Sequence, residues 1–233
     1  MILQPVVDIA EICAQKGISE VVLSPGSRCA PMTIAFNRHP QINVRTVSDE
    51  RAAGFIGLGI AQTTQQPVAL ICTSGTAALN YAPAVAEAFY QQIPLLVLTA
   101  DRPPEWIDQL DGQTIRQENI FGRHIKNSYS FPVDHTHADA VWFANRMVSE
   151  AINEATAFPA GPVHINVPLR EPFYPAENEK LEFNSDVKII KEFSADFALP
   201  QAQLQELQHE FRKFERVLVV AGQQQSDPET LQA

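Results

Sequence analysis

Short apolar runs alternate with segments of helical periodicity along the first 170 or so residues of the chain. The runs are rich in β-branched residues, and several are apolar almost without interruption, as in strands covered on both faces. They occupy residues 21–24, 42–48, 68–73, 95–100, 126–131 and 163–167, of which 126–131 is the weakest. This alternation predicts an α/β fold with a mostly parallel sheet and helices on both faces.

Helical periodicity is clearest in residues 137–157, where apolar side chains recur every three or four positions and predict a core-facing helix. The first fifteen residues lack the basic start and the cleavage site of a signal peptide. Their apolar residues are interrupted by Asp8 and Glu11, which predicts an amphipathic helix. Residues 67–86 are uncharged and about as long as a membrane span. Their Thr, Ser, Gly, Asn and Pro residues predict a strand, a turn and a helix instead.

A change of pattern near residue 171 predicts a domain boundary. We expect a first domain at residues 1–172 and, in the stretch rich in Pro, Glu, Asn and Asp, a linker at residues 173–200. Residues 201–233 are then the beginning of a central domain, which we expect to be truncated at its end. The alternative is that this segment packs against the first sheet, since consecutive elements are often neighbours.

Inside residues 201–233 the spacing predicts a helix at 201–216 and a strand at 216–222, and the Ser226/Glu229 pair predicts the start of another helix. One strand has no ladder partner for its backbone groups. This is the reason for expecting an incomplete domain here.

Composition limits the classes of partner. An apolar content of 45% and a charged content of 19% are typical of a soluble globular protein. The net charge of −10 argues against nucleic acid, because phosphate contacts need clustered Lys and Arg. No membrane partner is expected. Three cysteines without a CxxC pair suggest reduced thiols, and hence the cytoplasm.

Polar turns follow four consecutive predicted strands, with the sequences SPGSRCAP, SDER, TSGTA and TADRPPE. The carboxyl ends of parallel strands share the edge at which ligands bind, so these turns are expected to form one site. Each turn alone could instead supply a helix N-cap, through Ser27, Ser48 or Asp49, or Ser74.

Arg28 and Arg102 both follow strands at this edge. Guanidinium groups bind carboxylates bidentately, so two of them predict a substrate with more than one carboxylate. Ion pairs within the protein are the alternative for each.

Several other site types are disfavoured. The sequence contains neither GxxxxGK[ST] nor GxGxxG after the first strand, and CTSGT lacks the first Gly of a GxSxG nucleophile elbow. His135 and His137 are close in sequence, but a metal site needs further ligands. We therefore assign no metal ligand.

The chain resembles the N-terminal pyrimidine-binding domain of thiamine diphosphate-dependent enzymes over about residues 1–172. The resemblance rests on six motifs in a fixed order: PGSRCAP, SDERAAGFIGLGIA, CTSGTAALNYAPAVAEA, PLLVLTADRPPE, QTI and GPVHINVPLREP. PGSR, TADRPPE and QTI are most similar to the synthases of menaquinone biosynthesis within that family. This implies decarboxylation of 2-oxoglutarate and addition of the succinyl unit to isochorismate, with thiamine diphosphate and Mg²⁺ or Mn²⁺ as cofactors.

The resemblance also implies roles for individual residues. Glu50 matches the glutamate that hydrogen-bonds N1′ of the aminopyrimidine and favours its imino tautomer; without the resemblance it would be an ordinary helix-start residue. The positions that match the pyrimidine contacts are Thr73, Ser74, Gly75 and Thr76. The positions that match substrate contacts are Ser27, Arg28, Arg102 and Gln113. Gly112 stands where many relatives have Asn, which puts one contact to isochorismate in doubt.

In this family a C-terminal domain with a GDG…N motif holds the diphosphate and the metal, and no GDG occurs here. We therefore expect the chain alone to be inactive and the complete site to lie between subunits of a homodimer or homotetramer. Another decarboxylase or carboligase, similar to acetolactate synthase, is disfavoured by PGSR and DRPPE. A non-catalytic binding domain of the same fold is disfavoured by the presence of Glu50.

Overall fold

The computed structural model describes residues 3–171, 174, 180–193, 198–218, 220 and 222. It divides into two compact units, residues 1–192 and residues 193–233. The boundary lies within the segment that the sequence predicts as a linker.

The first unit is built on a six-stranded sheet in which every neighbouring pair is parallel, in the order β2-β1-β3-β4-β6-β5. The strands are β1 (Glu20–Leu23), β2 (Asn43–Thr46), β3 (Val68–Cys72), β4 (Leu95–Asp101), β5 (Ser128–Ser130) and β6 (Val163–Pro168). Each overlaps one of the predicted strands, so the predicted α/β fold is confirmed.

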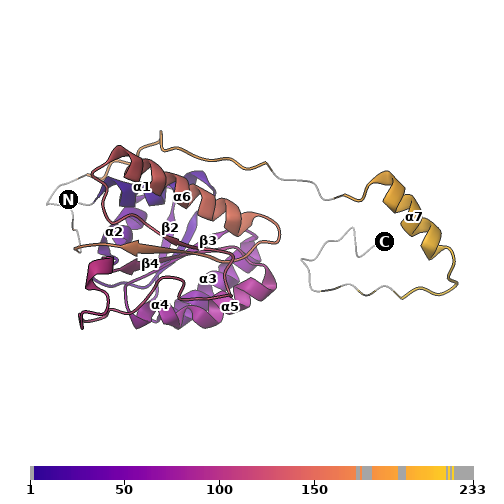
Figure 1. The fold of residues 1–233 in the computed structure, drawn as a ribbon, viewed down its shortest axis with the longest axis horizontal. Coiled ribbons are helices and arrows are strands. Elements are labelled where there is room, and N and C mark those ends of the chain that lie inside the picture. Colours follow the sequence, from indigo (N-terminus) through magenta and orange to yellow (C-terminus); the bar gives the residue numbers. More distant parts are fainter. Residues whose placement is uncertain are drawn as a thin grey trace. The chain divides into compact units, whose positions relative to one another are not determined.

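Helices cover both faces of this sheet (Figure 1). One face packs against α1 (Gln4–Gln15), α2 (Ala30–Arg38) and α6 (Ala138–Thr156). The other packs against α3 (Glu50–Thr64), α4 (Thr76–Asn80) and α5 (Ala82–Gln91). A short 3₁₀ helix, η1 (Pro104–Trp106), follows β4. Alternate residues of the central strands enter the two cores, which explains why these strands are apolar throughout.

The loop at residues 102–127 completes the second face next to β6. Phe121 and Ile125 are buried there in the same core as α3 and α5. Phe121 also lies edge-on to His164 of β6, with ring centroids 5.1 Å apart. This loop therefore contributes side chains to the core on the second face of the sheet, beside those of α3 and α5.

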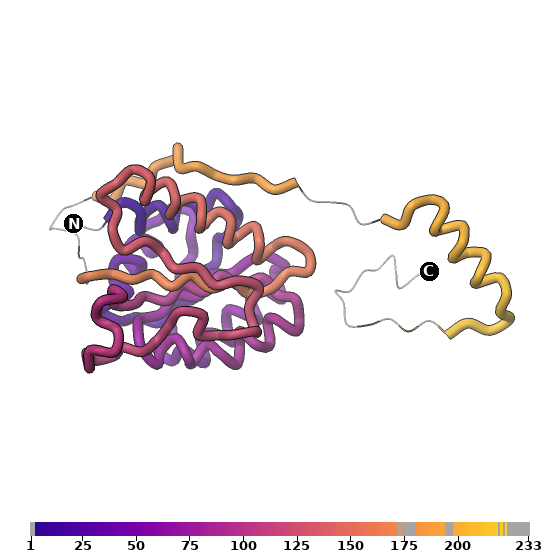
Figure 2. Tube along the Cα trace, in the orientation of Figure 1, coloured from indigo at the N-terminus to yellow at the C-terminus, as the bar shows by residue number. Residues whose placement is uncertain are grey.

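Residues 180–192, which we call the strap, belong to the first unit and pack on its helices α1 and α6. Figure 2 shows the strap as the upper of the two orange segments in this unit. Val187 is buried in the core between the sheet and α1, α2 and α6, which we call the first core. Phe183 lies edge-on to His39, with ring centroids 4.7 Å apart. Gln4 and Gln15 donate to backbone carbonyls of the strap at 2.9 and 3.0 Å. This part of the predicted linker thus has a defined place on the domain.

The second unit contains α7 (Gln201–Phe211), whose apolar side chains Leu204, Leu207 and Phe211 are exposed. The strand predicted at residues 216–222 is not found in the described part of that segment, 216–218, 220 and 222. A strand needs a ladder partner, and none pairs with it here. The helix predicted to begin at Ser226 lies outside the described residues. Of the described helices, none is long and apolar enough to cross a bilayer.

Candidate functional site

The predicted site residues lie in the segments that follow β1, β2, β3 and β4, beyond the carboxyl edge of the sheet. Each turn at this edge leads into a helix or a covering loop. Asp49 caps α3 by accepting a hydrogen bond from the Ala52 backbone nitrogen at 2.8 Å. The parallel register therefore brings the four polar turns to one side of the molecule, as the sequence predicts.

Glu50 is the first residue of α3 and is partly buried. Within the described part of the chain, its carboxylate has no hydrogen bond or ion pair. Burial is the main cause that raises the pKa of the Cys29 and Cys72 thiols, and the negative charge of Glu50 raises it further. Glu50 therefore lies near Cys29 and near Cys72, the last residue of β3, with its oxygen atoms available to a ligand.

The turn formed by Thr73, Ser74, Gly75 and Thr76 is held by the surrounding protein. A Cβ placed on Gly26 would lie 2.4 Å from the Thr73 Cβ, so the turns after β1 and β3 are in direct contact. Gly75 has φ +84°, and its backbone nitrogen donates to Oε1 of Gln117 at 2.7 Å. Thr76 is exposed at the start of α4.

Arg102 connects this turn to the loop that follows β4. Its Nη1 donates to the Ser74 hydroxyl and, at 3.1 Å, to the carbonyl oxygen of Gln113. Its Nε donates to Asp111 at 3.1 Å. Ser74, Arg102 and Gln113 are thus brought together, with the Gln113 side chain exposed.

Arg28 is held by the chain after β6. Its Nη1 donates to the carbonyl oxygens of Leu169 and Arg170 at 2.9 and 2.8 Å, and its guanidinium lies 5.7 Å from the Trp106 ring centroid. Burial, and then the charge of Arg102, lower the pKa of Arg28. The two cations are close enough to repel each other, which favours an anion near them. Ser27, beside Arg28, is exposed.

The sequence does not predict the buried polar network that lies beneath this edge. The network contains Thr99, Asp101, Gln117, His164 and Asn166, all between 0% and 5% exposed. The sequence signal was the presence of polar residues in otherwise apolar strands, in LLVLTAD and VHINV. Gln117 lies in a loop, and nothing in its local sequence marks it as buried.

The residues at this edge fit part of a thiamine diphosphate molecule. A carboxylate with no protein partner, such as that of Glu50, can accept a hydrogen bond from a protonated ring nitrogen, or donate one when it is itself protonated. The described residues contain no group of three or more His, Cys, Asp or Glu arranged for a metal ion. His137 caps α6 by accepting from the Asp139 backbone nitrogen at 3.2 Å, which accounts for one of the two neighbouring histidines.

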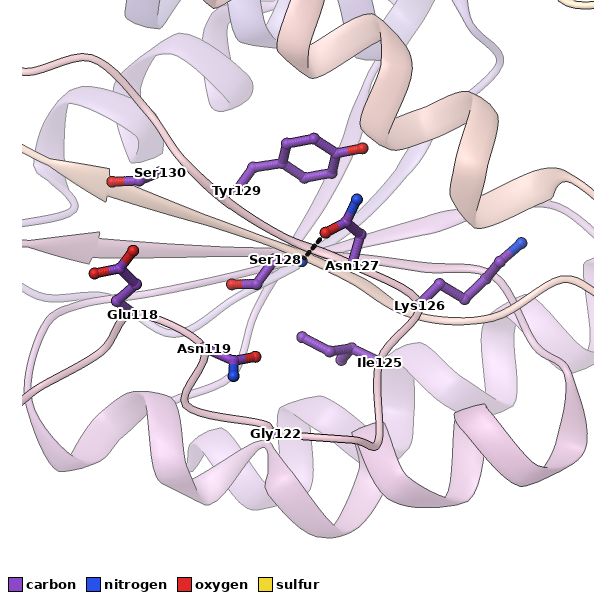
Figure 3. Close-up of a pocket in the computed structure, with 9 residues that line it drawn as sticks. All are labelled: Glu118, Asn119, Gly122, Ile125, Lys126, Asn127, Ser128, Tyr129 and Ser130. Carbon is purple, nitrogen blue, oxygen red and sulfur yellow. Dashed lines mark hydrogen bonds between the residues drawn. The ribbon is translucent and has the colours of Figure 1, made fainter.

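Two cavities lie away from the predicted residues. The first, of about 320 Å³, runs beside β5 and is shown in Figure 3. Ser128 and Ser130 line it from the strand, and Glu118 and Asn119 line it from the loop. The second, of about 400 Å³, is lined by residues that include Val133, His135 and Arg170. Neither contains a residue that the sequence assigns to the site.

Comparison with known proteins gives one family and a consistent set of relatives. The family described as "Thiamine pyrophosphate enzyme, N-terminal TPP binding domain" matches residues 7–121. A 2-succinyl-5-enolpyruvyl-6-hydroxy-3-cyclohexene-1-carboxylate synthase from Cytophaga hutchinsonii is 49% identical over 95% of this chain and 39% of its own length. Proteins of the same name from Porphyromonas gingivalis and Desulfotalea psychrophila are 42% and 41% identical, over 92% and 97% of this chain and 37% and 42% of theirs.

The chain spans about two fifths of the length of these relatives. The matched residues include the turns after β1, β2, β3 and β4, and therefore Glu50, Ser74 and Arg102. Residues 7–121 of this chain are therefore an N-terminal TPP-binding domain of the thiamine pyrophosphate enzyme type.

Proposed function

We propose that this chain is the pyrimidine-binding part of a thiamine diphosphate-dependent synthase that decarboxylates 2-oxoglutarate and adds the succinyl unit to isochorismate. The product in the relatives' shared name carries a succinyl group on a cyclohexene carboxylate, as this reaction requires. The observation that carries the proposal is the partly buried Glu50 carboxylate without a protein partner, at the edge where the motifs place the cofactor.

Glu50 has one task in this proposal, to hold a proton shared with N1′ of the aminopyrimidine ring. Thiamine diphosphate, when bound, supplies the carbon nucleophile for the 2-oxo acid. Partial burial strengthens the hydrogen bond to Glu50, because less water competes for the carboxylate. The contact between Gly26 and Thr73 and the fixed turn at Gly75 shape the surface against which the ring is placed.

Arg28 and Arg102 bind substrate carboxylates in this proposal. Both proposed substrates are dicarboxylates, and among the described contacts the Nη2 atoms of these arginines form no hydrogen bond. Ser27 and Gln113, both exposed nearby, contribute polar contacts. Gly112 has no side chain, so the polar contact to isochorismate that the resemblance implies at this position is missing in this proposal.

The remaining parts of the site belong to other chain segments in this proposal. Mg²⁺ or Mn²⁺ and the diphosphate are held by a C-terminal domain, across the interface of a homodimer or homotetramer in the cytoplasm. Residues 1–172 form the pyrimidine-binding domain, residues 173–200 the connection and residues 201–233 the beginning of the central domain. The exposed apolar face of α7 supports the last assignment, since such a face needs further structure to cover it.

Isochorismate consumption by the full-length protein tests the proposal. The assay contains 2-oxoglutarate, thiamine diphosphate and Mg²⁺ and compares wild type, Glu50→Gln and the control Glu87→Gln, which alters an exposed residue of α5. We expect consumption to require both substrates and to be mostly lost only in Glu50→Gln, which should fold normally.

Three results would count against the proposal. Normal turnover by Glu50→Gln removes this residue from the mechanism. Decarboxylation of another 2-oxo acid with isochorismate untouched indicates a different decarboxylase or carboligase. Failure of the full-length protein to bind thiamine diphosphate indicates a binding domain without this chemistry.

A further inference from the structure

We propose that Gln117 and Asn166 are positioning residues, which fix the Gly75 turn and Arg102 through one buried hydrogen-bond network. The inference rests on the proposed function, because those two elements are its cofactor and substrate contacts. Neither Gln117 nor Asn166 lies in a turn that the motifs assign to the site.

The network occupies one face of three neighbouring strands. Thr99 of β4 pairs with Asn166 of β6, and His164 of β6 pairs with Ser128 of β5. The same face of these strands further from the edge is apolar, as at Val97. Because an unpaired buried polar group is costly, a cluster of this kind persists only when its members are bonded to one another.

Gln117 joins the cluster to the Gly75 turn. Its Oε1 accepts from the Gly75 nitrogen at 2.7 Å, and its Nε2 donates to the Ala100 carbonyl and to Asn166 Oδ1, both at 3.0 Å. Gln117 is only 1% exposed. One side chain therefore fixes the distance between the turn after β3 and the strands β4 and β6.

Asn166 joins the cluster to Arg102. Its Nδ2 donates to Asp101 Oδ2 at 2.8 Å, and Asp101 Oδ1 accepts from the Arg102 backbone nitrogen at 2.8 Å. The side chain of Arg102 then returns to Ser74 in the same turn that Gln117 holds. The network thus closes a ring around the two elements of the candidate site.

The donors and acceptors of the cluster are mutually consistent. Thr99 donates to Asn166 Oδ1 at 2.9 Å, so it has only lone pairs left for His164 Nε2 at 2.8 Å. His164 must then carry its proton on Nε2 and accept from the Ser128 hydroxyl at its Nδ1, 3.2 Å away. Burial lowers the pKa of His164 to about 3, which agrees with a neutral imidazole. Ser128, the last member of this series of hydrogen bonds, lines the cavity of Figure 3.

A positioning role predicts that the two residues act on different kinetic constants. In the full-length protein, Gln117→Met leaves the Gly75 N–H without its acceptor, so we expect kcat to fall roughly tenfold to a hundredfold. Asn166→Leu releases Asp101, so we expect KM for 2-oxoglutarate to rise by a similar factor while kcat changes less. A general loss of stability would change both variants in the same way.

Tyr129→Phe is the matched control. Tyr129 lies on β5 next to Ser128, but its side chain points to the opposite face and donates to Glu154 at 2.7 Å. The control loses one side-chain hydrogen bond without touching the network. We expect its kinetic constants to equal those of wild type.

Hydrogen exchange supplies a readout that needs no turnover. In wild type we expect the Gly75 amide to exchange much more slowly than amides of exposed turns, and in Gln117→Met this protection should be lost. The exchange rate of the Gly75 amide in wild type tests the positioning role even if a variant does not fold. Rapid exchange of Gly75 in wild type overturns the inference.

The kinetic outcomes separate this inference from the proposed function. If wild type is active and both network variants match Tyr129→Phe, only the positioning role is overturned. If wild type neither binds thiamine diphosphate nor consumes 2-oxoglutarate, the proposed function fails and the positioning role fails with it.

Discussion

Gly75 adopts a backbone conformation, φ +84° and ψ −148°, that is open mainly to glycine. A Cβ at this position would also lie 3.0 Å from the Gln113 carbonyl oxygen. Strain in the backbone and contact with the loop after β4 therefore add together. The residue is fixed by the geometry of the turn as well as by its hydrogen bond to Gln117.

We predict that Gly75→Ala lowers the free energy of unfolding by about 1–3 kcal/mol, the usual magnitude for a residue forced into a sparsely populated backbone region. Urea unfolding measures this change. The control is Gly59→Ala in α3, where a Cβ meets nothing within 4 Å. The control should be neutral or stabilising by up to about 1 kcal/mol. Equal effects of the two substitutions would contradict the argument.

His164 should make stability depend on pH. Its pKa is about 3 in the folded protein and 6.5 in the unfolded chain, so the unfolded state binds more protons between these values. The stabilisation is present above pH 6.5 and is lost as the pH falls toward 3. We expect up to about 1.4 kcal/mol per pH unit from this group.

Urea unfolding of wild type and His164→Gln over this pH range measures the contribution. The wild-type free energy of unfolding should fall more steeply with decreasing pH than that of the variant. His209→Gln, which changes an exposed histidine of α7, should retain the wild-type slope. A variant slope equal to that of wild type would mean that His164 is not the group responsible.

The strap changes the environment of α1. Asp8 and Glu11, which the sequence places on the polar side of an amphipathic helix, are only 3% and 8% exposed. Glu11 bonds to His39 at 3.0 Å, and the ring of His39 is covered by Phe183 of the strap. The strap also accepts one hydrogen bond from Lys16, the residue after α1, at the Ile190 carbonyl oxygen, 2.9 Å away.

We predict that Val187→Asp releases the strap, because it places a charge where the wild-type side chain is buried in the first core. Limited proteolysis should then cut within residues 180–192 faster than in wild type. Lys188→Asp changes the adjacent, exposed residue and is the control. Equal cleavage rates for the two variants would show that the strap is not held by this contact.

Residues 1–192 and 193–233 are separate compact units. The first contains the complete sheet and both of its apolar cores. In the second, every described residue is exposed, including those of α7. Stability should therefore reside in the first unit.

We predict that a chain ending at Glu192 unfolds cooperatively, with the same urea midpoint as the chain of 233 residues. Circular dichroism and tryptophan fluorescence should give coincident transitions, because Trp106 and Trp142 both lie in the first unit. A chain ending at Arg170 is the informative comparison, since it lacks the strap and should unfold at lower urea. A lower midpoint for the Glu192 chain would show that residues 193–233 stabilise the domain.

Local sequence patterns were enough to predict the six strands of the sheet, the α/β fold and the edge of the candidate site. Strand and helix periodicities are local, and a parallel order of strands brings their polar turns to one edge whatever the details of packing. Glu50, Ser74 and Arg102 could be selected for this reason, together with the family motifs around them.

Which of these side chains meet, and what holds them, follows from the three-dimensional packing and not from local sequence. The partners of Arg28, the ring through Gln117 and Asn166, and the burial of Asp8 and Glu11 all depend on residues distant in sequence. A polar residue in a strand or loop has the same local pattern whether it is solvated or bonded inside the protein. Its surroundings are set by long-range packing, and those surroundings decide whether it supports the candidate site.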